Sequence, residues 1–290
     1  MDMDTKVSDL LKLLEERLAG IDRVELMALL VAKSKHYHNY SINNMMLAGI
    51  QLCRQQGKPF DLETFSNLEL APFPIWQKWR YRIKRGSKAL NILVPFIKTK
   101  VNPEAEKREN GKDNKKRIVG FGIRSVFDIS QTEKFTANDD ALHRRVSTRT
   151  ARIDYNDLIS RIEAAGLRVV SVPLREGEGG HISGNVITLN CNNSMEAKYC
   201  TLLHELSHYC LGHTAAGNNQ ERSVEELEAE ATAFVVGNQL GIDIPSEFYI
   251  AAWGGDGQRI RKSLSRIERA AEKVSGIIGL DTMPASQVVA

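Results

Sequence analysis

The sequence predicts an α+β protein built from two different segments. Apolar residues spaced three and four apart indicate helices near both ends of the chain, and short apolar or alternating runs between them indicate strands. The length of 290 residues suits two domains of ordinary size. Charge divides the same way: residues 1–150 hold 27 Lys and Arg against 18 Asp and Glu, a net +9, whereas residues 151–290 hold 12 against 18, a net −6. The basic segment is therefore expected to meet a polyanion.

The N-terminal segment is predicted to begin with three helices. The first is amphipathic, and one side of it carries Val7, Leu10, Leu11, Leu14 and Leu18. The second is expected at residues 24–33. The third is expected at residues 43–56 and ends before Gly57.

Two strands are expected after these helices. Residues 89–96 predict a buried strand, and residues 118–129 predict another. Gly86 lies at a turn just before the first strand and predicts a hairpin with a basic tip. The Lys-rich stretch 98–117 between the two strands is expected to be an exposed loop.

The C-terminal segment contains the motif HELSH at residues 204–208. On a helix, His204 and His208 lie one turn apart on one face, so both can reach a single metal ion. Glu205 then lies beside the open coordination position, where metal-assisted hydrolysis needs a general base. The motif predicts a catalytic site for Zn²⁺, with Mn²⁺ as the alternative, and the most plausible reaction is peptide hydrolysis.

A third ligand is expected from the next helix, which is predicted to start near Val224. Ser223 and Glu226 have the spacing of a capping box. We assign Glu226 as the third ligand because a His₂Glu catalytic site needs one carboxylate from a second helix. Glu230, one turn further on, is expected to support a ligand histidine. The small side chain of Ala229 allows the two helices to approach closely.

Neighbouring residues are given plainer roles. A solvated charged face is the alternative for these glutamates; it is expected for Glu225 and left open for Glu228. His213 is expected to cap or pack the end of the motif helix. Residues 184–190 predict a short strand, which would pair with an extended substrate if it faces the cleft.

Composition indicates a cytoplasmic protein with no membrane partner. The chain has no run of eighteen apolar residues, and its acidic start does not resemble a signal peptide. Four cysteines form no C-x-x-C pair and are expected to be reduced thiols with packing roles: Cys53, Cys191, Cys200 and Cys210.

Aromatic and basic side chains alternate in the N-terminal segment, as single-stranded nucleic acid binding requires. Bases stack on ring faces while cations follow the phosphates. Spacing alone favours the alternative, that Trp76 and Trp79 are core residues and not stacking platforms. The candidate DNA contacts are Tyr37, Tyr40, Asn43, Asn44, Trp79, Arg80, Lys84, Arg85 and Lys88.

Motifs in both segments resemble a known family. HELSHYCLGH followed by EELEAEATAFVV is similar to the minimal zincin domains of the ImmA/IrrE type and, more closely, to the metallopeptidase domain of ArdC-like antirestriction proteins. YSINN at 40–44, WRYRIKRGSKA at 79–89 and VFDISQTE at 126–133 resemble the single-stranded-DNA-binding domain of the same family. The resemblance implies Glu226 as third ligand and Glu230 as its support. It also implies a DNA-binding domain at 1–140, a linker at 141–152 and a zincin-like metallopeptidase domain at 153–290.

We therefore expect a protein that binds single-stranded DNA, carries a zinc peptidase site for an unidentified protein substrate, and protects incoming mobile-element DNA. Two alternatives remain open. One is a regulatory metalloprotease of the ImmA/IrrE type that cleaves a repressor. The other is a DNA-binding protein whose metal site is not catalytic, although Glu205 argues against it because a structural site needs no general base.

Overall fold

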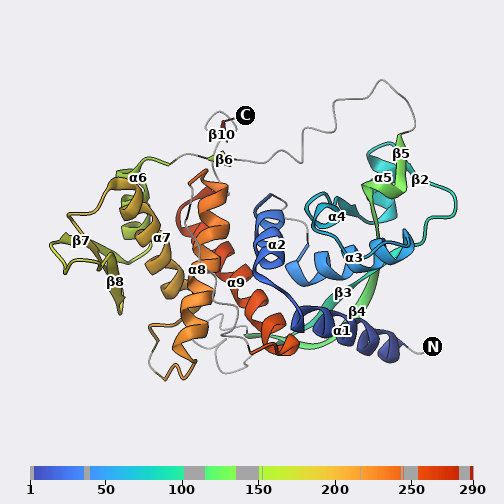
Figure 1. The fold of residues 1–290 in the computed structure, drawn as a ribbon, viewed down its shortest axis with the longest axis horizontal. Coiled ribbons are helices and arrows are strands. Elements are labelled where there is room, and N and C mark those ends of the chain that lie inside the picture. The colour runs from blue at the N-terminus through green and yellow to red at the C-terminus, as the bar shows by residue number, and fades with distance from the viewer. Residues whose placement is uncertain are drawn as a thin grey trace.

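The computed structural model confirms an α+β fold (Figure 1). It describes residues 3–35, 40–100, 115–134, 150–151, 153–215, 217–242, 244, 254–280 and 288–289. The N-terminal helices are α1 (Met3–Ala19), α2 (Arg23–Lys35), α3 (Ile42–Gln55), α4 (Leu62–Ser66) and α5 (Phe73–Lys78). The C-terminal helices are α6 (Tyr155–Ala164), α7 (Met195–Leu211), α8 (Arg222–Gln239) and α9 (Gly257–Ile277). The first three helices lie where the sequence predicts them.

The strands form small sheets. In the N-terminal part they are β1 (Leu70–Ala71), β2 (Tyr81–Ile83), β3 (Leu90–Lys100), β4 (Lys115–Asp128) and β5 (Thr132–Lys134). Further along the chain they are β6 (Thr150–Ala151), β7 (Arg168–Val172), β8 (Gly180–Ser183), β9 (Val186–Asn190) and β10 (Val288–Val289). Strand β6 pairs with β10. None of the described helices is both long and apolar enough to cross a membrane.

The long antiparallel pair of β3 and β4 forms the main N-terminal sheet, with β1 on the other side of β4. The predicted hairpin at Gly86 is wrong, because β2 pairs with β5 and not with β3. The predicted loop 98–117 is also too long. Residues 98–100 and 115–117 continue the two strands, and residues 101–114 lie outside the described part of the chain.

Helix α3 completes the free edge of β3 with side-chain amides. The Asn44 amide donates to the Leu93 carbonyl at 2.8 Å and accepts from the Leu93 N–H at 2.9 Å. Gln51, two helical turns later, makes the same pair of bonds with Asn91 at 2.8 and 2.9 Å. These bonds satisfy backbone groups that a neighbouring strand would otherwise have to pair.

The C-terminal sheet has the order β7–β9–β8, with β9 parallel to β7 and antiparallel to β8. The strand expected to pair with an extended substrate is β9, and this expectation is wrong because both of its edges are already occupied. Strand β8 is the edge strand of this sheet, so its outer backbone groups are the ones that a further strand would pair with.

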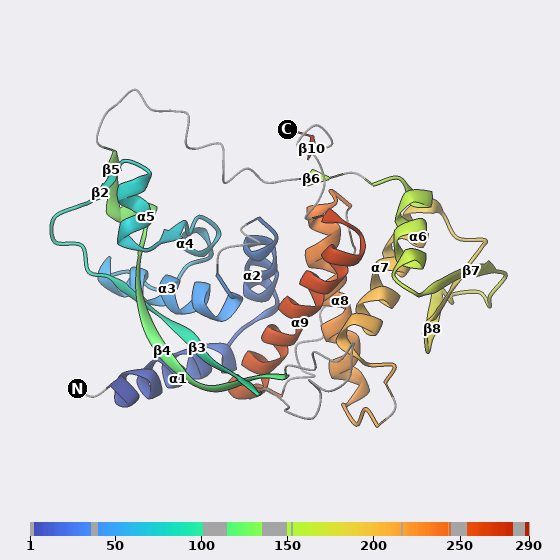
Figure 2. The same cartoon turned by 180° about the vertical axis from the view of Figure 1, so that it is seen from behind.

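The two segments share one hydrophobic core, in which α9 packs against α7 and α8 on one side and against α1 and α3 on the other (Figure 2). Buried polar contacts join them as well: Lys33 on α2 pairs with Glu268 on α9. At the start of α9, a Cβ added to Gly257 would lie 1.7 Å from the Glu15 carbonyl oxygen, so only glycine permits this approach to α1. The division at residues 141–152 stays a prediction, and most of that stretch lies outside the described residues.

Candidate metal centre

Helix α7 carries the HELSH motif, and local signals set both of its ends. The Ser194 hydroxyl accepts from the Ala197 N–H at the N-terminus, and Gly212 ends the helix in the left-handed conformation, at φ 80°. Leu202, Leu203 and Leu206 are fully buried and fix the rotation of the helix about its axis. His204 and His208 are consequently held toward α8.

Helix α8 supplies Glu226, although it does not begin as the sequence predicts. The predicted capping box is wrong: α8 starts at Arg222, no side chain caps it, and the Ser223 hydroxyl donates to the Glu221 carboxylate at 2.8 Å. Glu226 therefore does not bond the helix end, and its carboxylate is available to the histidines of α7. Ala229 on the same helix is fully buried, and α8 packs against α7.

The structure brings three potential ligand atoms together. The Nε2 atoms of His204 and His208 are 3.0 Å apart, and Glu226 Oε2 lies 3.4 Å from the first and 3.5 Å from the second. Ligand atoms of a tetrahedral zinc ion are about 3.3 Å apart, because the bonds are about 2.0–2.1 Å long. Two imidazoles and a carboxylate at these separations fit a divalent metal ion, and the cluster is a candidate site for one.

The carboxylates and histidines of the site shift the pKa values of His204 and Glu226. Burial alone would lower the pKa of His204, but the hydrogen bond to Glu226 and the carboxylates of Glu205 and Glu230 outweigh it and raise that pKa. Hydrogen bonds from His204 and His208 hold the pKa of Glu226 far below its usual range. The carboxylate therefore stays charged at neutral pH, as a metal ligand must.

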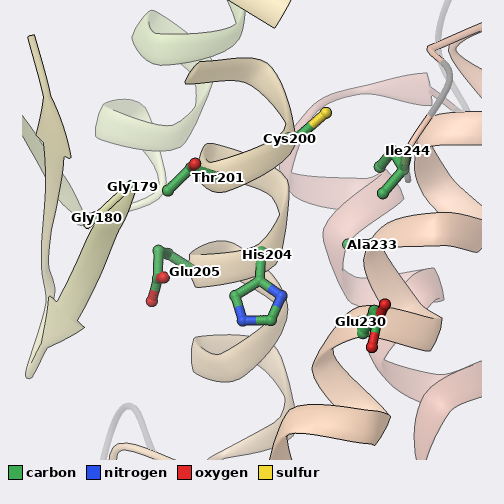
Figure 3. Close-up of a pocket in the computed structure, with 9 residues that line it drawn as sticks. All are labelled: Gly179, Gly180, Cys200, Thr201, His204, Glu205, Glu230, Ala233 and Ile244. Atoms are coloured by element: carbon green, nitrogen blue, oxygen red, sulfur yellow. The ribbon is translucent and has the colours of Figure 1, made fainter. Parts of the chain in front are cut away.

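A pocket of about 350 Å³ adjoins His204 and Glu205 (Figure 3). It is lined by Gly179, Gly180, Cys200, Thr201, His204, Glu205, Glu230, Ala233 and Ile244. Glu205 lies on the side of α7 that faces β8, and Glu230 lines the opposite wall from α8 (Figure 3). Glu205 is only 8% exposed, and burial raises its pKa above the usual 4.5, the direction that suits a general base.

Two residues beside the cluster were not recognised from the sequence. His213 contacts the Nδ1 atom of His208, and Glu228 contacts His213. The expectation left open for Glu228, a solvated face, is wrong because its side chain is only 2% exposed. His213 packs against the end of the helix, as expected, and its ring contacts the candidate ligand His208. The available signal was Gly212, since a left-handed glycine reverses the chain and returns the next residue onto the last helical turn.

The basic residues proposed as DNA contacts are exposed. Arg80, Lys84, Arg85 and Lys88 all lie on the surface between α5 and β3. The Lys84 ammonium group donates a hydrogen bond to the Ser130 carbonyl at 2.8 Å.

The other proposed DNA contacts in the described part of the chain are bonded within the protein or partly buried. Asn44 binds β3 as described above. The Asn43 amide donates to the Ser265 hydroxyl at 2.9 Å, so neither amide faces solvent freely. Tyr40 is half-buried, and half-buried Trp79 lies edge-on to Trp76. Tyr37 lies outside the described residues. Phe73, on α5, is an exposed aromatic that the sequence analysis did not select.

Comparisons with known proteins agree with this arrangement. Residues 162–254 match the model of the peptidase M78 family, described as the IrrE N-terminal-like domain. This stretch holds α7, α8 and the three candidate ligand residues, and this part of the chain has a metallopeptidase-like fold. The chain is also 23% identical to the Bacillus anthracis protein pXO2-81 over an alignment that covers 83% of this chain and 45% of the relative. It therefore spans about half the length of that curated relative.

Two solved structures are similar to most of the chain. The Mn(II)-bound crystal structure of the antirestriction protein ArdC from the R388 plasmid matches 89% of this chain and 98% of its own, with a TM-score of 0.51 and 15% identity. The chain has the ArdC fold. The metal-free ArdC structure matches 73% of this chain with a TM-score of 0.48 and 16% identity.

Proposed function

We propose that the chain is an antirestriction-type protein that binds single-stranded DNA and carries a divalent-metal-dependent peptidase site. The observation that carries the proposal is the cluster of His204, His208 and Glu226, with Glu205 beside it, in a chain with the ArdC fold. The solved ArdC protein is described as an antirestriction protein and has a Mn(II)-bound form. The antirestriction activity and the bound divalent metal ion are properties of ArdC that we propose for this chain.

Each residue of the site has a distinct role in the proposed reaction. His204 and His208 would hold the ion through Nε2 and Glu226 through a carboxylate oxygen. Two nitrogen ligands and one oxygen ligand favour zinc and also accept manganese. A bound ion would supply Lewis acidity. The Glu205 carboxylate would accept a proton from the attacking water and return it to the leaving amine.

Substrate would enter along β8. Gly180 lines the pocket, and β8 has no second partner strand among the described residues. An extended peptide could therefore add to this edge with its backbone beside Glu205. Glycine is required at position 180, because a Cβ there would lie 2.4 Å from the Thr188 carbonyl oxygen.

Single-stranded DNA would bind the basic surface that follows α5. Arg80, Lys84, Arg85 and Lys88 can follow phosphates without reading sequence. Arg82 lies among them but is paired with Glu133 at 2.8 Å, so its charge is partly neutralised.

The catalytic part is tested with Glu205→Gln in the full-length protein. This change removes a proton acceptor but no proposed ligand, so metal content and DNA affinity should stay near wild type while peptide hydrolysis is lost. Glu196→Gln, at an exposed position in the first turn of the same helix, is the matched control. Loss of metal in Glu205→Gln, or retained hydrolysis, would refute the role assigned to this carboxylate.

The ligand set is tested by metal content. The purified protein should bind close to one divalent ion, and His204→Ala and Glu226→Ala should each reduce that content. If Glu226→Ala keeps the ion while Glu230→Ala loses it, the third ligand is wrongly assigned.

The DNA surface is tested by reversing three charges together, at Lys84, Arg85 and Lys88. If each contacts one phosphate, the slope of log affinity against log salt should flatten by about 2, since each single-strand contact contributes about 0.7. The control reverses three exposed lysines elsewhere: Lys6, Lys12 and Lys262. Equal loss in both triple variants would show that net charge, and not this surface, drives binding.

A second candidate function is a regulatory metalloprotease, which the IrrE N-terminal-like match over residues 162–254 favours. The Glu205→Gln variant separates the two functions. If protection of incoming DNA survives this change, the protein protects by occupying the strand. If protection is lost while DNA binding persists, cleavage of a protein is the essential step.

A further inference from the structure

A chain of hydrogen bonds leads from the proposed ligand His208 to a buried carboxylate. Gly212 reverses the backbone, and the His213 N–H bonds to the His208 carbonyl at 3.0 Å. The two rings then meet, with 2.9 Å between their Nδ1 atoms. On its far side, His213 Nε2 lies 3.3 Å from Glu228 Oε2. The side chains of His213 and Glu228 are only 3% and 2% exposed, so water does not compete for these bonds.

Helix α9 fixes the far end of this chain. Arg266 Nε lies 3.1 Å from Glu228 Oε2, and the Ser263 hydroxyl donates to Glu228 Oε1. A carboxylate buried this deeply is stable only when its oxygens are bonded. Glu228 therefore has a fixed position and a fixed negative charge behind His213.

The pairing of two Nδ1 atoms determines where the protons lie. One of the two must donate and the other accept. Glu228 accepts a hydrogen bond and therefore places the proton of a neutral His213 on Nε2, which leaves His213 Nδ1 as an acceptor. With a metal ion bound, His208 would then carry its proton on Nδ1 and present the Nε2 lone pair to the ion, the same atom that hydrogen-bonds to Glu226 when no ion is bound. The opposite arrangement would protonate Nε2 of His208 and block it as a ligand.

We propose that His213 and Glu228 are positioning residues of the metal centre, which hold His208 in the one tautomer and ring orientation that can bind a metal ion. The inference rests on the metal site proposed above. Neither His213 nor Glu228 would bind the metal ion or touch the substrate. Groups that orient ligand histidines in this way typically contribute about 10- to 100-fold to metal affinity.

The first test is titration of metal-stripped, full-length variants with Zn²⁺. His213→Ala should bind about 10- to 100-fold more weakly than wild type. His213→Gln should recover part of the loss, because its amide oxygen can accept from His208 Nδ1. Glu228→Gln should also weaken binding. The matched controls are His181→Ala, an exposed histidine bonded to Glu178 at 3.1 Å, and Glu225→Gln on α8.

These variants separate failure of the inference from failure of the metal site. If His213→Ala binds Zn²⁺ within twofold of wild type while His204→Ala does not bind, the positioning role is refuted and the site stands. If His204→Ala and Glu226→Ala also keep wild-type affinity, the site itself is refuted.

A second measurement does not depend on any variant folding. Long-range ¹H–¹⁵N correlation spectra of the zinc-loaded wild-type protein report which ring nitrogen carries each proton. We expect His208 protonated on Nδ1 and His213 on Nε2. A proton on Nδ1 of His213 would overturn the proposal.

Discussion

Replacing Lys33 by Met should destabilise the protein by about 3–5 kcal/mol at pH 7. The Lys33 side chain is 3% exposed, and its ammonium group contacts Glu268, itself 11% exposed, and the Tyr40 carbonyl at 3.1 Å. Methionine is apolar and of similar length, so the change creates no large cavity. It does remove the positive charge that pairs with the Glu268 carboxylate. The cost is therefore that of an unpaired buried carboxylate, which is far larger than the value of a surface ion pair.

The pH dependence of this cost has a definite sign. Burial raises the pKa of Glu268 above its usual 4.5, and Lys33 opposes that rise. A carboxyl group with a raised folded-state pKa contributes stability that is complete below its unfolded pKa and lost as pH rises through the folded value. Without Lys33 the rise is larger, so the cost of Lys33→Met should be smallest below pH 4.5 and largest near neutral pH.

Urea unfolding at pH 4 and pH 7 measures both effects. Lys33→Met combined with Glu268→Gln should be more stable than Lys33→Met alone, because the double variant carries no stranded charge. Lys12→Met is the surface control, since Lys12 and Glu16 are 77% and 64% exposed and their pair is worth only about 0.3–0.5 kcal/mol. A cost below about 1 kcal/mol for Lys33→Met, or one that does not change with pH, would refute the reasoning.

Three further predictions concern the site and the N-terminal sheet. Gly212→Ala should lower the free energy of unfolding by about 1–2 kcal/mol, measured in urea, because alanine resists the left-handed conformation at φ 80°. The pKa of His204 is raised above 6.5 when no metal is bound, so a proton competes with the ion for this ring. Zn²⁺ titrations at pH 6, 7 and 8 should therefore show affinity that rises with pH. The stability contributed by the protonated ring, measured by thermal denaturation without metal, should fall over the same pH range. Asn44→Ala should lower the free energy of unfolding by about 1–3 kcal/mol, since it leaves the backbone of Leu93 unpaired, and should leave the DNA affinity of the folded protein unchanged in filter-binding assays. Reduced DNA affinity with unchanged stability would instead support the contact with bases.

The parts of the site that the sequence predicts are those set by short-range geometry. His204 and His208 are four residues apart, so their common face needs nothing but a helix. The position of Glu226 needed one further assumption, that the next helix packs against the motif helix, and α8 does pack against α7. The roles proposed for these residues, as distinct from their positions, stay predictions.

The features that the sequence analysis missed depend on distant partners. Glu228 has the pattern of an exposed helical glutamate, and its burial is tolerable because Ser263 and Arg266, on another helix, and His213 bond its oxygens. Asn44 has the pattern of a free polar side chain, but its partner Leu93 lies 49 positions away. The pairing of β2 with β5 was missed for the same reason, because a local turn at Gly86 cannot report which strands eventually meet.

The close approach at Gly257 has a consequence for how such a chain can change over generations. The backbone of Glu15 occupies the place of the missing side chain, so the first and last helices must fit each other atom by atom. A recombination event that joined the beginning of one relative to the end of another would bring together two surfaces that had not varied together. Such hybrids should survive only when the exchange carries both α1 and α9, and surveys of natural mosaics should find breakpoints that keep this pair of helices from a single parent.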